Sequence, residues 1–106
     1  MAVIDNLKAM LAGGQDSALL RYSLGNEYFK RQEFEAGADH LAKAVALDPT
    51  YSAAWKLYGK LLAEGGRLAD AEHAYTSGIA AAEACGDIQA AKEMRVFRRR
   101  VQKQLG

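Results

Sequence analysis

The chain has 106 residues and a formal net charge of +1, with half of its residues apolar and a quarter charged. This length and composition predict one globular domain and exclude a disordered chain. Proline occurs once and β-branched residues are few, which favours helix over sheet.

Helix breakers divide the chain into six segments with helical periodicity. The breakers are Gly13-Gly14, Asp48-Pro49, Gly65-Gly66 and Gly86-Asp87. We expect helices over residues 2–12, 17–30, 34–47, 52–64, 68–84 and 87–105. Asp16 or Ser17 can cap the second helix, and Asp87 can cap the last. Because the connections are short, consecutive helices are expected to lie antiparallel, as hairpins.

The middle of the chain repeats with a period of 34 residues. Gly25 and Gly59 are separated by this distance, and so are Leu41 and Tyr75. Other pairs that keep only their size class are Leu24 with Tyr58, Tyr28 with Leu62, Phe34 with Leu68, and Ala44 with Gly78. A glycine inside a helix costs about 1 kcal/mol relative to alanine. Its recurrence at one place predicts that another helix approaches the backbone there.

This pattern resembles the tetratricopeptide repeat, a 34-residue helix-turn-helix with the motif W-x2-L-G-x2-Y…A-x3-F…P. Residues 18–51 match the motif at Leu24, Gly25, Tyr28, Leu41, Ala44 and Pro49. Residues 52–85 match it at Trp55, Gly59, Ala71 and Tyr75. The resemblance implies an all-α fold, a right-handed solenoid of helical hairpins.

The segments on either side of the two repeats fit the same frame. Residues 2–12 resemble the second helix of a truncated repeat, and residues 87–105 lack the Leu-Gly pair of a complete one. Terminal repeats are often atypical because they cover the ends of the stack. We therefore expect one domain over residues 1–106, with 2–12 as a half-repeat and 87–105 as a capping helix.

No constellation of residues indicates catalysis, a metal or a cofactor. His40 and His73 each follow an acidic residue, but adjacent residues in a helix do not face each other. Neither histidine has a second one at i+3 or i+4, as a metal site would need. We expect a protein that is not an enzyme.

A second stripe on the first helix of each repeat is the candidate partner-binding surface. Tyr22, Asn26 and Phe29 share the helix face opposite the expected packing stripe, and Lys56 and Lys60 stand 34 residues after the first two. The resemblance implies that these helices line a concave groove that holds a peptide. The expected partner-binding residues are Tyr22, Asn26, Phe29, Tyr51, Lys56 and Lys60. Aromatic anchors and lysines predict a protein or peptide partner with apolar and acidic residues.

Ordinary packing is the alternative explanation of this stripe. A helix with apolar residues on both sides is also expected when both sides are buried, with residues 2–12 covering Tyr22 and Phe29. Lys56 and Lys60 are also typical of a solvated helix face. Some members of the family grip a C-terminal carboxylate with Lys, Asn and Arg side chains. Only Asn26 matches that set here, so we do not expect such a clamp.

The last helix supports a rival function. Its apolar stripe, which is expected to dock on the second repeat, consists of Ala90, Met94, Phe97, Val101 and Leu105. A separate basic face consists of Lys92, Arg95, Arg99 and Lys103. Four cations on one face could bind an anionic surface or nucleic acid, but cations near a helix C-terminus also offset its dipole. No aromatic residue interleaves the basic face, which makes nucleic acid unlikely. Self-association through an incompletely capped end of the solenoid remains a further alternative.

The remaining features bear on location. Cys85 is the only cysteine, so no intrachain disulfide can form. No apolar run approaches the roughly 18 residues that a membrane span needs. Asp5 and Lys8 interrupt the apolar start that a secretory signal would have. We therefore expect a cytoplasmic protein.

Overall fold

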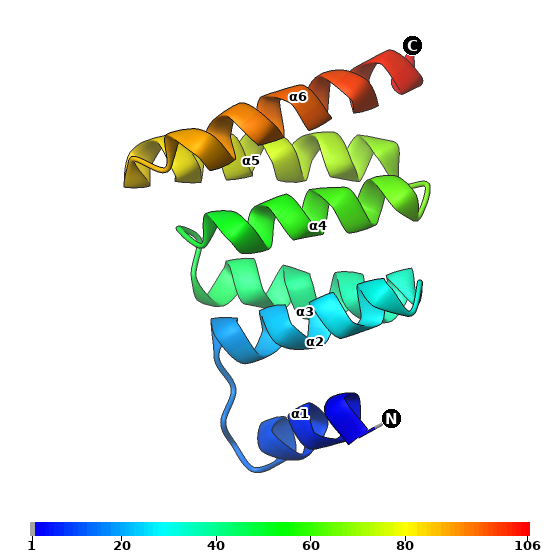
Figure 1. Cartoon of the computed structure of the whole chain (residues 1–106), viewed down its shortest axis with the longest axis vertical. Coiled ribbons are helices and arrows are strands. Elements are labelled where there is room, and N and C mark those ends of the chain that lie inside the picture. Colours follow the sequence, from blue (N-terminus) through cyan, green and yellow to red (C-terminus); the bar gives the residue numbers. More distant parts are fainter. Residues whose placement is uncertain (1) are drawn as a thin grey trace.

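A computed structural model describes residues 2–106, which form six α-helices and no strand (Figure 1). The helices are α1 (Ala2–Ala12), α2 (Ala18–Lys30), α3 (Phe34–Leu47), α4 (Ser52–Glu64), α5 (Leu68–Cys85) and α6 (Ile88–Leu105). The expected segments are confirmed to within one residue at every end. The all-α prediction is confirmed with them.

Side-chain caps and special backbone conformations set the helix ends where the sequence indicates them. The Ser17 hydroxyl accepts a hydrogen bond from the Leu20 amide at 3.1 Å, and the Asp87 carboxylate accepts one from the Ala90 amide at 3.2 Å. Asp48 adopts an extended conformation before Pro49, so α3 stops there. Gly86 ends α5 with φ of +76°, a left-handed conformation that favours glycine.

The helices form two layers stacked along the long axis of the molecule (Figure 1). In the inner layer, α2 contacts α4 and α4 contacts α6, whereas α3 and α5 do not contact each other within the described residues. The outer layer is formed by α3 and α5, each packed against the helices on both sides of it. The inner face of α2, α4 and α6 is therefore continuous across the repeats.

Glycines allow the two layers to approach closely. A Cβ atom built on Gly25 would lie 2.5 Å from Cγ of Leu41, and one built on Gly59 would fall inside the Tyr75 ring. Each glycine thus receives a large side chain of the other helix in its own hairpin. The close contacts predicted at Gly25 and Gly59 are confirmed.

The apolar core is divided. The main cluster joins α3 to α6 and includes the buried side chains Leu41, Leu61, Leu62, Tyr75 and Met94. A separate cluster couples α1 to α2, with Ile4, Leu7 and Leu11 on α1 and Leu20, Leu24 and Tyr28 on α2. Both flanking helices therefore cover apolar surface that the two hairpins alone would expose.

Candidate functional site

Most of the predicted partner-binding residues lie together on the inner face. The Tyr22 and Tyr51 ring centroids are 5.2 Å apart. Nζ of Lys60 lies 5.7 Å from the centroid of the Phe29 ring. Lys56 lies one turn before Lys60 on α4. The structure thus groups side chains from α2, from the turn before α4, and from α4 itself.

Tyr22 and Phe29 are half-buried, and the face of α2 that they occupy is not the one that α1 covers. Both rings pack against the main core cluster. The contacts of α1 are on the stripe of Leu20, Leu24 and Tyr28. Residues 2–12 therefore do not account for the burial of Tyr22 and Phe29, and part of each ring remains exposed at the inner face.

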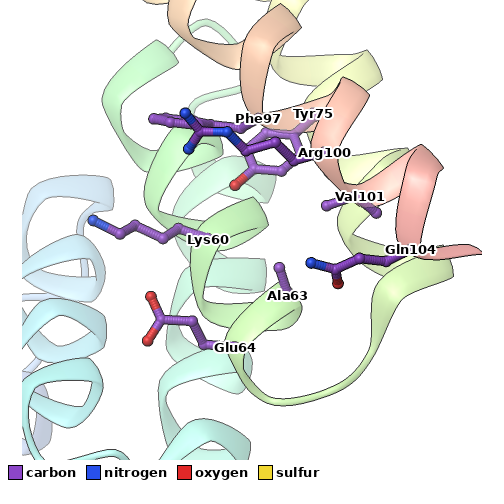
Figure 2. Close-up of a pocket in the computed structure, with 8 residues that line it drawn as sticks. All are labelled: Lys60, Ala63, Glu64, Tyr75, Phe97, Arg100, Val101 and Gln104. Carbon is purple, nitrogen blue, oxygen red and sulfur yellow. The ribbon is translucent and has the colours of Figure 1, made fainter.

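Two hollows lie side by side on this face and share Lys60 and Phe97 in their walls. The first, here called the Tyr22 hollow, has a volume of about 300 Å³ and is lined by Tyr22, Ala53, Lys56, Leu57, Lys60, Glu93 and Phe97. The second, here called the Tyr75 hollow, has a volume of about 280 Å³ and is lined by Lys60, Ala63, Glu64, Tyr75, Phe97, Arg100, Val101 and Gln104 (Figure 2). Together they form a groove between α4 and α6. Asn26 is half-buried on α2 and lines neither hollow.

Sequence reasoning missed the α6 wall of this groove. Glu93, Phe97 and Arg100 line it, and they stand 37 residues, not 34, after Lys56, Lys60 and Ala63. The cause is α5, which has 18 residues where α3 has 14. Phe97 was expected only to dock α6; its ring does pack on Tyr75, with centroids 6.0 Å apart, but it also faces the groove. The missing proline near the end of α5 was the available signal, since nothing in the sequence stops that helix before Gly86.

The charges of the groove are not equally available to a ligand. Lys56 Nζ lies 2.7 Å from Glu93 Oε1, and this hydrogen bond holds the pKa of Glu93 below its usual value. Lys60 and Arg100 instead lie over the Phe29 and Phe97 rings, at 5.7 Å and 5.6 Å from the centroids. Within the described residues neither takes part in an ion pair. The positive charge left for a ligand is therefore that of Lys60 and Arg100.

The predicted basic face of α6 is only partly formed. Lys92, Arg99 and Lys103 are exposed on the outer side of the helix. Arg95 is half-buried and forms an ion pair with Glu83 of α5, so its charge is taken up within the fold. The expected row of four cations is therefore a row of three.

Metal and membrane sites were also sought among the described residues. Residues 2–106 contain no cluster of three His, Cys, Asp or Glu side chains arranged to hold a metal ion. In the same part of the chain, no helix has both the length and the hydropathy to cross a membrane.

Comparisons with known proteins agree with the repeat pattern. A family model for the tetratricopeptide repeat matches residues 28–94. A TPR repeat-containing protein of Pseudomonas aeruginosa is 48% identical over 99 residues, which cover 93% of this chain and 94% of that protein. A Bordetella parapertussis protein of known solution structure is 46% identical with a TM-score of 0.83, covering 98% of this chain and 90% of that one. A crystal structure of MamA protein is 29% identical with a TM-score of 0.73, covering 94% of this chain and 57% of that one. The chain belongs to the tetratricopeptide-repeat family.

Proposed function

We propose that this protein is a non-catalytic interaction module that binds a peptide segment or helix of a partner protein in the groove between α4 and α6. The tetratricopeptide-repeat fold is in general a protein-interaction fold. The observation that supports this groove is its composition: half-exposed aromatic rings stand beside two cations that no carboxylate neutralises.

The partner-binding surface includes the side chains expected from the sequence and the α6 wall. Tyr22, Phe29 and Tyr51 offer rigid aromatic contact area at one edge of the groove. Asn26 can hold a peptide backbone through its amide. Lys60 favours acidic residues in the partner and Phe97 favours apolar ones. Lys56 contributes mainly through its alkyl chain, because its charge is paired with Glu93.

The test is a comparison of charge reversals on the two faces of the molecule. We expect Lys60→Glu to weaken capture of the partner by immobilised protein, since Lys60 lines both hollows. Lys92→Glu is the matched control, with the same charge change on the exposed outer side of α6. Circular dichroism establishes that both variants are folded. If only Lys92→Glu loses the partner, the groove is not the binding site.

Anion binding by the outer face of α6 is the second candidate. The exposed row of Lys92, Arg99 and Lys103 favours it. Binding dominated by phosphate contacts falls steeply with ionic strength. Fluorescence anisotropy with a labelled single-stranded oligonucleotide at increasing salt therefore measures this activity separately from the groove. Sedimentation at several protein concentrations checks the other alternative, self-association.

A further inference from the structure

The Tyr75 hollow has a floor with a polar atom that the fold leaves unused. Tyr75 is 2% exposed, yet its hydroxyl has no hydrogen-bond partner among the described residues and is not counted among the fully buried polar atoms. The small exposed part of this side chain therefore includes its oxygen. Figure 2 shows Tyr75 gathered with Phe97 and Arg100, with its hydroxyl at the end of the ring that lies toward Lys60.

We propose that the Tyr75 hollow is an anchor subsite for an acidic side chain of the bound partner, flanked in the partner by an apolar residue. The inference rests on the proposed function, because it names the chemistry of one part of the same groove. The occupant is a side chain rather than a chain terminus, because the groove continues past Lys60 and Phe97 into the Tyr22 hollow.

The polar half of the subsite is a hydroxyl with a cation on either side. The Arg100 guanidinium comes from α6 and the Lys60 ammonium from α4, and both line the hollow. The Phe97 and Phe29 rings hold these cations by cation–π contacts and leave their N–H groups free to donate. A carboxylate accepts several hydrogen bonds at once, and bonds to charged donors are the stronger ones. Burial and the nearby Glu64 raise the pKa of Tyr75 to about 12, so its hydroxyl stays protonated and donates at neutral pH.

The apolar half of the subsite lies directly beside these donors. Ala63, Phe97 and Val101 line the same hollow. An apolar partner residue next to the acidic one can cover the Phe97 ring while the carboxylate reaches Tyr75. Burying that contact excludes water and strengthens the charged hydrogen bonds beside it.

Glu64 gives the proposal a sign that can be tested. It is the one acidic residue of the hollow wall, so it repels an incoming carboxylate. Glu64→Gln removes that repulsion and keeps the shape of the side chain. A carboxylate ligand is expected to bind this variant more tightly, whereas a cationic ligand would bind it less tightly.

The experiment begins with a random dodecapeptide library fused at its C-terminus to a phage coat protein, panned on the intact chain. The C-terminal fusion removes the free terminal carboxylate, so any acid selected is a side chain. The best binder is synthesised with an amidated C-terminus and titrated by fluorescence anisotropy. We expect an Asp or Glu beside an apolar residue, and we expect its replacement by Asn or Gln to weaken binding about tenfold.

Three variants of the protein locate the contact. Tyr75→Phe keeps the buried ring and should weaken binding severalfold. Arg100→Gln should do the same and should abolish the difference between the acidic peptide and its amide counterpart. Arg99→Gln is the matched control, since Arg99 is exposed on the outer side of the same helix, and it should leave affinity unchanged.

The outcomes separate this inference from the proposed function. A selected peptide that Lys60→Glu weakens, but that Tyr75→Phe, Arg100→Gln and Glu64→Gln leave unchanged, keeps the groove and overturns the acidic subsite. A peptide that is insensitive to all four variants overturns both. A peptide whose binding weakens with Glu64→Gln and strengthens with Arg100→Gln shows a cationic occupant, which also overturns the inference.

Discussion

Gly59 fills a place on α4 that no other residue can take without displacing Tyr75. A Cβ atom at this position would fall inside the Tyr75 ring, which is almost fully buried and cannot easily move aside. We expect Gly59→Ala to destabilise the protein by about 1–3 kcal/mol, because overpacking outweighs the gain in helix propensity. Urea denaturation followed by circular dichroism measures the free energy of unfolding.

The control for this substitution is Gly13→Ala. A Cβ atom at Gly13 would meet only carbonyl oxygens of its own helix, at 3.4 Å. We expect no more than a few tenths of a kcal/mol there. A Gly59→Ala variant as stable as the Gly13→Ala variant would contradict the close contact between α4 and α5.

His40 makes stability depend on pH. Its ring stacks on Tyr28 with centroids 5.5 Å apart, and its Nδ1 lies 3.1 Å from NH1 of Arg21, which can only donate. Burial, and then the charge of Arg21, lower the pKa of His40 below its ordinary 6.5. The unfolded chain therefore binds a proton more readily than the folded chain. Stability is complete above pH 6.5 and falls as the pH drops from there through the lower, folded-state pKa.

We therefore expect the melting temperature to decrease between pH 7 and about pH 5. The carboxyl groups of Asp16, Asp87 and Glu93 have lowered pKa values and lose their contribution only at more acidic pH. His40→Phe keeps the stacking and should flatten the profile in this window, whereas His73→Asn, at an exposed position, should not. An unchanged slope in His40→Phe would assign the pH dependence to other groups.

At the scale of the element, α5 explains both the success and the failure of prediction from sequence. Glycine, proline and capping residues are local signals, so every helix was predicted to within a residue of its ends. The face that α6 turns toward the groove depends on how far α5 continues. No local signal reports that length in advance of Gly86, so counting 34 residues from Lys60 leads to Met94, which is buried, and not to Phe97.

Removal of α6 tests its role in the fold. Met94 is fully buried and packs where α5 has Gly78, and Val101 is 4% exposed. Deleting residues 88–106 uncovers this part of α5, so we expect loss of a single cooperative unfolding transition and a tendency to associate. Calorimetry and size-exclusion chromatography measure the two effects.

A point substitution keeps this prediction independent of the truncation. Met94→Ala in the complete chain should destabilise the protein by about 2–5 kcal/mol. A truncated chain that unfolds cooperatively as a monomer, together with a small effect of Met94→Ala, would show that α6 is not part of the structural core.

At the scale of the whole molecule, the divided core predicts unequal stability along the solenoid. α1 is held only through Ile4, Leu7 and Leu11, in a cluster separate from the one that joins α3 to α6. Each repeat of a solenoid contacts only its neighbours, so the ends can open while the centre stays folded.

Native-state hydrogen exchange should therefore find the least protected helical amides in α1 and the most protected ones in α4 and α5. Leu24→Ala removes a fully buried contact of α1 from the α2 side, and it should lower protection in α1 more than in α5. Equal protection throughout the chain would mean that the two clusters unfold as one unit.

The longer α5 also affects how relatives of this protein should be compared. An alignment that advances in fixed steps of 34 pairs Lys60 with Met94, a core residue, and so mixes ligand-facing positions with interior ones. The family model stops matching at residue 94, in the middle of α6 and before Phe97 and Arg100. Surveys that score each repeat as a unit would therefore underestimate how far binding specificity has diverged at this end of the solenoid. Aligning helices by their buried positions places Phe97 and Arg100 in the same column class as Lys60, where differences between homologues become interpretable as differences in what they bind.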